Sequence, residues 1–194
     1  MDLRNLLFSY RSFTPIPIAV TIIYFSHPAL PYFHIGLGLI LIGELTRINA
    51  VRYAGGATRT MKVGAPSLCT AGPYSFTRNP LYFGNMIIYC GIVLTAGGIY
   101  MWHLLILTFI YFTFQYTMII SLEEERLREL FGKEYEIFCQ KVPRLFPRLT
   151  PWVNTDNRLP KSVQKTLKTE KRTLQNLLFI LSCIFLKAYQ GITF

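Results

Sequence analysis

The sequence predicts an all-α integral membrane protein with about five transmembrane helices and a cytosolic amphipathic helix after the fourth. Hydrophobic residues make up 52% of the 194-residue chain, and only 15% of it is charged. Soluble domains carry about 25% charged residues, so the composition indicates a membrane protein. We expect residues 1–194 to form a single membrane domain without a cleavable signal peptide.

The first two spans are predicted to form a helical hairpin within residues 1–54. The first span covers about residues 13–30 and has prolines near its ends, where proline is tolerated. The second covers about residues 32–53 and continues past Glu44 and Arg47. Both are close to the length of about 20 residues that a helix needs to cross a bilayer.

The central part of the chain, residues 55–151, begins with a glycine-rich loop and continues into two further spans. These spans cover about residues 81–97 and 99–122, and a tight glycine turn joins them, so we expect an antiparallel hairpin. Gly84 and Gly91 lie seven residues apart on the third span. They leave room on one face for either a neighbouring helix or an acyl chain.

A charged amphipathic helix is predicted after the fourth span, over about residues 123–141. A glycine inside a helix costs about 1 kcal/mol relative to alanine, so we expect a kink at Gly132. After an irregular, proline-punctuated stretch, residues 154–172 are polar and basic. Residues 174–194 are apolar again, and we favour a fifth span over a helix lying in the interface. The apolar face of the charged helix has spacings of three and four residues: Leu127, Leu130, Phe131, Tyr135 and Phe138.

The positive charges indicate the topology. Of the 20 Lys and Arg residues, 19 lie in or beside three segments, namely the N-terminus, residues 47–78 and residues 126–172. Because cytosolic loops carry the excess of Lys and Arg, we place the N-terminus and the segments after spans two and four in the cytosol. We expect the basic residues behind the net charge of +10 to interact with anionic lipid headgroups, and no nucleic-acid partner is expected.

A polar run precedes the third span. Arg78 follows the turn Gly72-Pro73 and comes directly before Asn79-Pro80. Asparagine followed by proline is typical of a helix start, with Asn79 as the N-cap. Arg78 is either a snorkelling arginine beside a cap or a clamp for a carboxylate or phosphate, since a helix N-terminus already favours negative groups.

Three consecutive acids end the fourth span. Ionisable groups at the mouth of a membrane bundle are costly, so a functional site is their default interpretation. The acids could pair with nearby arginines or with Arg78 across the bundle, or they could bind a cation. Glu123 shares a helix face with Leu127 and should point inward, whereas the direction of Glu124 is less defined. Arg78 on one wall and Glu123 on the other would fit an amino-acid zwitterion.

These motifs, in this order, resemble the membrane methyltransferases related to isoprenylcysteine carboxyl methyltransferase and phospholipid N-methyltransferase. The resemblance covers about residues 44–147. Taken together the motifs are fairly specific, although each is weak alone. They are Gly72-Pro73-Tyr74, Arg78-Asn79-Pro80-Leu81-Tyr82-Phe83-Gly84, Glu123-Glu124-x-x-Leu127-x-x-x-Phe131-Gly132-x-x-Tyr135 and Val142-Pro143-Arg144-Leu145-Phe146-Pro147.

The resemblance implies a multi-span enzyme that uses S-adenosylmethionine to methylate a lipid or lipid-like acceptor. It implies a cofactor-binding core over residues 55–151, with Arg78, Glu123 and Glu124 as catalytic residues. Asn79 stands where many members have histidine, which puts any role for a titrating imidazole in doubt. The cofactor-binding residues implied are Gly72, Pro73, Tyr74, Arg78, Asn79, Pro80, Tyr82, Glu123 and Glu124.

Two other functions stay open at this point: an NADPH-dependent reductase of sterol-like lipids, and a non-enzymatic lipid-binding scaffold. The four cysteines are scattered without CxxC spacing, so no metal site is expected. The expected partners are the bilayer and the lipid-like acceptor, with no obligate protein partner. The expected location is an inner, cytoplasmic or endomembrane bilayer, with the active site facing the cytosol.

Overall fold

A computed structural model describes residues 2–55 and 64–192, and within these ranges the fold is entirely helical. The predicted all-α class is therefore confirmed. Part of the predicted glycine-rich loop, residues 56–63, lies outside the described residues. The elements in chain order are α1 (Leu3–Ser9), α2 (Pro15–Tyr24), α3 (Tyr32–Ala54), the 3₁₀ helix η2 (Gly72–Ser75), α4 (Pro80–Ala96), α5 (Met101–Lys141) and α6 (Val163–Ile192).

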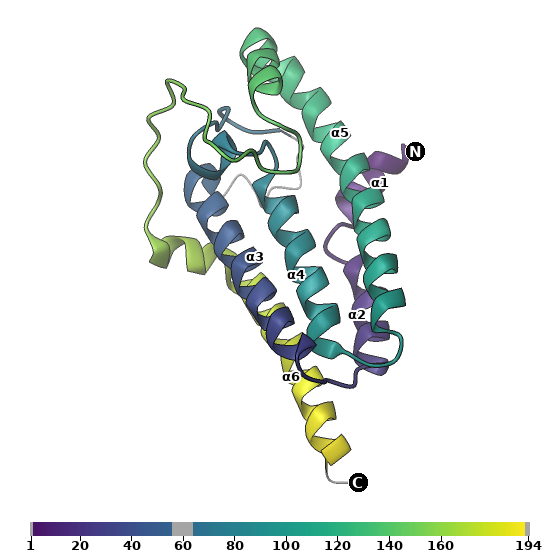
Figure 1. The fold of residues 1–194 in the computed structure, drawn as a ribbon. Coiled ribbons are helices and arrows are strands. Elements are labelled where there is room, and N and C mark those ends of the chain that lie inside the picture. Colours follow the sequence, from purple (N-terminus) through teal and green to yellow (C-terminus); the bar gives the residue numbers. More distant parts are fainter. Residues whose placement is uncertain (1, 56–63, 193–194) are drawn as a thin grey trace.

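The helices α3 and α4 form the most extensive pair of the bundle (Figure 1). Glycines face each other across their contact. A Cβ atom on Gly84 would lie 2.9 Å from the carbonyl oxygen of Gly43, and one on Gly91 would lie 2.8 Å from that of Gly36. Such small residues let two helix backbones approach closely. The room left by Gly84 and Gly91 is therefore filled by α3, not by an acyl chain.

The first span is shorter than predicted. Helix α2 has ten residues and ends at Tyr24, whereas the prediction placed the helical stretch over residues 13–30. Beyond the end of α2, the amide of His27 donates a hydrogen bond of 2.7 Å to the carbonyl of Ala96. This bond ties the α2–α3 connection to the turn after α4.

The fourth span runs directly into the charged helix within α5, whose 41 residues comprise two helical stretches that meet at a kink. The predicted kink is present: Gly132 has φ 48° and ψ −121°, outside the helical region. Beyond the kink, Tyr135 and Phe138 are buried against Val142. The charged part is thus an extension of the fourth span, and its apolar face packs onto the loops at that end of the bundle.

The last helix starts earlier than predicted. The basic stretch before residue 174 is already helical, since α6 begins at Val163. Just before it, the hydroxyl of Ser162 accepts a hydrogen bond of 3.3 Å from the amide of Lys165. The side chain of Glu170 is only 1% exposed, and it reaches Arg47 of α3 at 2.5 Å. This pair attaches the basic part of α6 to the bundle.

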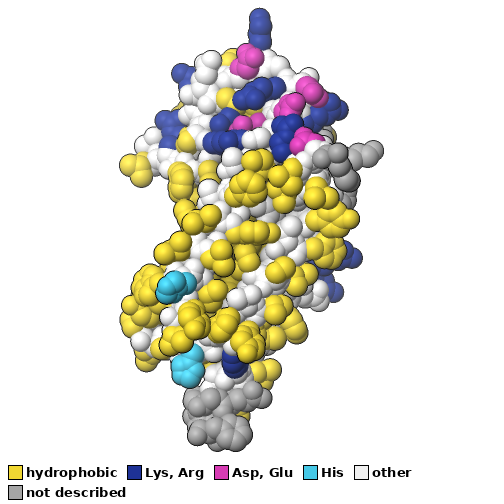
Figure 2. All heavy atoms as spheres, turned by 90° about the vertical axis from the view of Figure 1, so that its right-hand side faces the viewer, with side chains coloured by type: hydrophobic (Ala, Val, Ile, Leu, Met, Phe, Trp, Pro, Cys, Tyr) yellow, Lys and Arg dark blue, Asp and Glu magenta, His cyan; other side chains and the backbone are white. Residues whose placement is uncertain are grey.

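Two helices, α3 and α5, are long and apolar enough to cross a membrane in the part of the chain that the structure describes. The apolar helices α2 and α4 are shorter, so the predicted count of five spans stays a prediction. On the face shown in Figure 2, acidic and basic side chains gather mainly at one end, while hydrophobic side chains cover most of the body. That distribution is the one expected for a bundle with one polar end outside the bilayer.

Candidate functional site

The candidate site lies at the end of the bundle where α4 begins and the charged part of α5 starts. Gly72 opens η2 with φ +58°, a conformation that favours glycine. A Cβ atom at this position would lie 2.5 Å from the ring of Tyr53. The hydroxyl of Ser75 closes the turn with a hydrogen bond of 2.7 Å to the carbonyl of Gly72. The chain is thereby directed back over the end of α3 before it enters α4.

The residues just before α4 are fixed by the segment that follows α5. The amide of Arg78 donates to the carbonyl of Pro143 at 2.9 Å. The side-chain amide of Asn79 donates to the carbonyl of Arg144 at 2.8 Å. Asn79 occupies the N-cap position but makes no side-chain cap, so the predicted capping role is wrong. Pro80 begins the helix as predicted. Asn79 instead joins the two motif segments.

Glu124 lies between two arginines. Its carboxylate is 3.3 Å from Nη1 of Arg78 and 3.4 Å from Nε of Arg144. The side chains of Arg78 and Glu124 are 11% and 9% exposed, whereas that of Arg144 is 38% exposed. The guanidinium of Arg78 also contacts the thiol of Cys139. The sequence left open whether the acids pair with nearby arginines or with Arg78 across the bundle. Glu124 pairs with Arg78 and points inward.

Glu123 has a different environment from its neighbour. The hydroxyl of Tyr82 donates a hydrogen bond of 2.9 Å to its carboxylate. No Lys or Arg within residues 2–55 and 64–192 forms an ion pair with it. Burial raises the pKa of Glu123 to about 7, although the Tyr82 hydrogen bond and the charge of Arg11 act in the opposite direction. Two adjacent carboxylates therefore have different roles available to them, one paired with cations and one able to titrate near neutral pH.

Tyr74 forms an apolar wall beside these charges. It packs against Tyr135, Phe138 and Val142 beyond the kink of α5. Burial raises the pKa of its hydroxyl, and the nearby thiol of Cys69 adds to the shift. The fold thus brings the predicted residues of the 72–82 run and the paired glutamates to one end of the bundle.

Two contributors were not among the predicted site residues. Arg144 was noted only as part of the closing motif, and its position before Phe146-Pro147 gave no sign that it reaches Glu124. The N-terminus also approaches: Arg4, on the short helix α1, pairs with Glu125 at 2.8 Å. Nothing in the spacing of the sequence indicated that contact.

The buried atoms of the cluster fit a zwitterionic ligand. Glu124 Oε1, Arg78 Nε and Arg144 Nε are buried, and none makes a hydrogen bond of good geometry within the described part of the chain, although Glu124 Oε1 and Arg144 Nε belong to the two ion pairs above. Buried polar atoms are nearly always hydrogen-bonded, so such atoms need an explanation. A carboxylate could accept from the two arginines and an ammonium could donate to Glu124. The amino-acid end of S-adenosylmethionine carries both groups.

Comparison with known families decides the relationship. Residues 32–134, just over half of the chain, match the family model described as phospholipid methyltransferase. The chain belongs to the phospholipid methyltransferase family. No curated protein and no solved structure matched the chain. The match confirms the resemblance drawn from the motifs, and it favours a methyltransferase over a reductase or a scaffold.

The matched region contains every predicted site residue, from Gly72 to Glu124. Arg144, the helices α1 and α2, and α6 lie outside it. Arg144 and Arg4 of α1 therefore contact the glutamate cluster from outside the matched region.

Proposed function

We propose that the protein transfers a methyl group from S-adenosylmethionine to a lipid or lipid-like acceptor at the cytosolic face of a membrane. The observation that carries the proposal is the buried cluster of Arg78, Glu124 and Arg144 beside Glu123, in a chain of the phospholipid methyltransferase family. The cluster offers both signs of charge at an end of the bundle that a lipid and a water-soluble cofactor could both reach.

The cofactor would be held by its amino-acid end. Arg78 and Arg144 would bind its carboxylate, and Glu124 would accept hydrogen bonds from its ammonium. When bound, S-adenosylmethionine supplies a methyl group on a positively charged sulfur. The run from Gly72 to Tyr74 forms a neighbouring wall that limits the access of water. Aligning the reacting atoms and excluding water are the main tasks of the protein in such a displacement.

Glu123 would act on the acceptor. An ammonium must lose a proton before its nitrogen can attack a methyl group, and a carboxylate with a pKa of about 7 can accept that proton near neutral pH. Tyr82 holds this carboxylate by a hydrogen bond and fixes its direction. A carboxylate acceptor would need no base. The pH dependence of turnover therefore separates the two acceptor classes.

The proposed orientation follows from the charges. The charged part of α5 and the segment that follows it carry the Lys and Arg residues between positions 126 and 161, and Figure 1 shows both at the same end of the bundle as the site. By the positive-inside rule this end faces the cytosol. The apolar body then lies in an inner, cytoplasmic or endomembrane bilayer, from which the acceptor enters.

Profiling of lipid extracts tests the proposed reaction. Membranes containing the protein are incubated with S-adenosylmethionine labelled in its methyl group, and the lipids are extracted and separated. We expect label in a lipid fraction, and a large loss of label with Arg78→Ala. Arg126→Ala serves as the matched control, because Arg126 forms an exposed pair with Glu129 at 2.6 Å. The proposal would be contradicted if no lipid fraction carried label after incubation of the folded protein in membranes of several compositions.

A further inference from the structure

The N-terminal segment lies along α5 and reaches the glutamates. Arg4 of α1 pairs with Glu125 at 2.8 Å, and Figure 1 shows α1 beside α5. Farther along the segment, the hydroxyl of Thr14 accepts a hydrogen bond of 2.7 Å from the side-chain amide of Gln115. The residues between these two contacts, which include Arg11, are therefore held close to this stretch of α5.

Arg11 is half-buried on this segment. The central carbon of its guanidinium lies 4.0 Å from the centre of the Phe8 ring, and Nη1 donates a hydrogen bond of 2.8 Å to the carbonyl of the same residue. Phe8 is buried in the apolar cluster against which Tyr82 packs. Tyr82 in turn holds Glu123 through its hydroxyl. The guanidinium and the carboxylate are therefore both attached to this cluster, one through Phe8 and the other through Tyr82.

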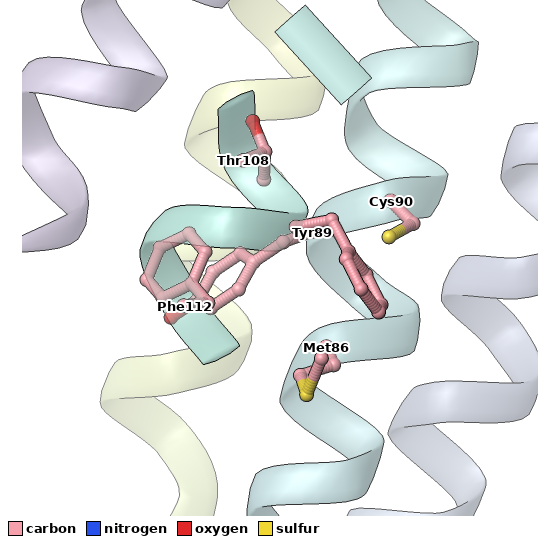
Figure 3. Close-up of a pocket in the computed structure, with 6 residues that line it drawn as sticks. Met86, Tyr89, Cys90, Thr108 and Phe112 are labelled. Atoms are coloured by element: carbon pink, nitrogen blue, oxygen red, sulfur yellow. The ribbon is translucent and has the colours of Figure 1, made fainter. Parts of the chain in front are cut away.

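The interior next to this cluster is closely packed. Figure 3 shows Tyr89 of α4 and Phe112 of α5, whose rings stack with their centres 3.9 Å apart. The cavity beside them has a volume of about 30 Å³, which is the space of about one water molecule. A polar head group that reaches Glu123 is therefore held among the charged side chains at this end and does not move deeper into the bundle.

The two adjacent glutamates have different cationic neighbours. Successive residues of an α-helix point about 100° apart. Glu124 faces Arg78 and Arg144. Burial raises the pKa of Glu123, and the positive charge of Arg11 acts against that rise. Because no Lys or Arg of the described residues forms an ion pair with Glu123, this charge acts across a distance that a ligand with both signs of charge could bridge.

We propose that Arg11 binds the phosphate of an aminophospholipid acceptor whose ammonium lies at Glu123. The inference rests on the proposed function and narrows its acceptor to a head group that carries both charges. In an ethanolamine head group, two carbon atoms separate the ammonium from the phosphodiester, so a carboxylate and a nearby guanidinium match its two ends. Arginine suits this task because its planar fork of N–H donors matches phosphate oxygens. The carboxylate of a prenylcysteine would instead meet the negative charge of Glu123.

Turnover of two matched acceptors tests the proposal. One is phosphatidylethanolamine, and the other joins the same amine to the same acyl chains through an uncharged linker in place of the phosphate. With methyl-labelled S-adenosylmethionine in nanodiscs, we expect Arg11→Gln to lower kcat/KM for phosphatidylethanolamine about tenfold, chiefly through KM, which is the lower end of the effect of a hydrogen bond between charged groups. Turnover of the phosphate-free lipid should stay within about twofold. Arg11→Lys keeps the positive charge and should restore much of the loss.

Arg4→Gln is the matched control, because Arg4 lies on the same segment but pairs with Glu125. Exposed ion pairs contribute little, so both acceptors should be methylated within about twofold of the unmodified rate. An equal loss with both acceptors in Arg11→Gln would show that Arg11 only holds the N-terminal segment on α5, and it would overturn the proposal. A loss with Arg4→Gln as large as that with Arg11→Gln would overturn it as well.

Lipid binding tests the same contact without turnover and without a substitution. Native mass spectrometry of the unmodified protein, offered both lipids in equal amounts, should show phosphatidylethanolamine retained about tenfold more than the phosphate-free lipid. Equal retention would overturn the phosphate contact, even where methyl transfer is observed. Glycerophosphoethanolamine has the same head group without acyl chains, and displacement of the lipid by an equal concentration of it would overturn the lipid source. Selective retention without methyl transfer to any acceptor would refute the proposed function and leave the head-group site intact.

Discussion

The molecule contains two buried charge clusters that can be compared. One lies where α4 begins and the charged part of α5 starts, and the other lies between α3 and α6. In the second, Arg47 forms a short hydrogen bond of 2.5 Å with Glu170, whose side chain is 1% exposed, and Glu44 lies 3.8 Å from the same guanidinium. In the first, Glu124 sits 3.3 Å and 3.4 Å from two arginines, one of them partly exposed.

We interpret the difference as one between a structural clamp and the proposed ligand site. Arg47 and Glu170 lie on two regular helices, and their short hydrogen bond joins those helices directly. The cluster around Glu124 depends on loops that meet across the end of the bundle, and its contacts are longer. Burial of charge is therefore not by itself a sign of function. The longer contacts around Glu124 and the partial exposure of Arg144 distinguish the two cases.

Glu170→Ala should give the largest loss of stability. Removing one partner of a buried ion pair leaves an uncompensated charge and typically costs about 3–5 kcal/mol. We expect a clearly lower midpoint of thermal unfolding in detergent, with unchanged cofactor affinity in the protein that remains folded. Glu125→Ala is the control, since the side chain of Glu125 is 57% exposed. Unchanged unfolding by Glu170→Ala would show that the pair is no clamp.

Arg78→Ala and Glu124→Ala should have the opposite signature. A hydrogen bond to a charged group contributes about 1.5–3 kcal/mol, so each substitution should weaken S-adenosylmethionine binding roughly ten- to a hundredfold. Glu123→Ala is expected to weaken binding too. Dissociation constants from calorimetry check this expectation. If unfolding temperatures fall while affinities hold, the cluster is a second structural clamp.

The pH dependence of turnover sharpens the contrast between the two adjacent glutamates. Glu123 can accept a proton only when it is deprotonated, so turnover of an amine acceptor should rise as the pH increases through about 7. One pH unit below that value, about a tenth of the carboxylates remain charged. Glu123→Gln should remove this dependence along with most of the activity. A flat profile in the unmodified protein would argue for an acceptor that needs no base.

Arg126→Ala should have the smallest effect. The pair of Arg126 with Glu129 is about half exposed on both sides, and exposed pairs typically contribute about 0–1 kcal/mol. We expect unfolding temperature, cofactor affinity and turnover to stay close to those of the unmodified protein. A large effect on binding would place the site further along α5 than proposed here.

The sequence allowed much of this to be predicted, because several features depend on local rules. The start of α4 at Pro80 and the kink at Gly132 follow from the backbone properties of proline and glycine. The pairing of Arg78 with a glutamate was among the stated alternatives, since opposite charges at one end of a bundle attract.

Other features depend on contacts between distant segments and could not be read from local patterns. Asn79 bonds to the carbonyl of Arg144, 65 residues later, instead of capping its own helix. The ion pair that attaches the basic part of α6 to the bundle likewise joins Glu170 to Arg47, 123 residues away. Hydropathy likewise does not register the hydrogen bond from His27 to Ala96, which lies just beyond the end of α2.

Calorimetric titration of the purified protein in lipid nanodiscs with S-adenosylhomocysteine, the demethylated product of the cofactor, tests the central claim most directly. The account predicts one binding site per chain in the unmodified protein. It also predicts that Arg78→Ala increases the dissociation constant roughly ten- to a hundredfold, because a charge-assisted hydrogen bond contributes about 1.5–3 kcal/mol to binding. Absence of binding of either S-adenosylhomocysteine or S-adenosylmethionine to folded protein would contradict it.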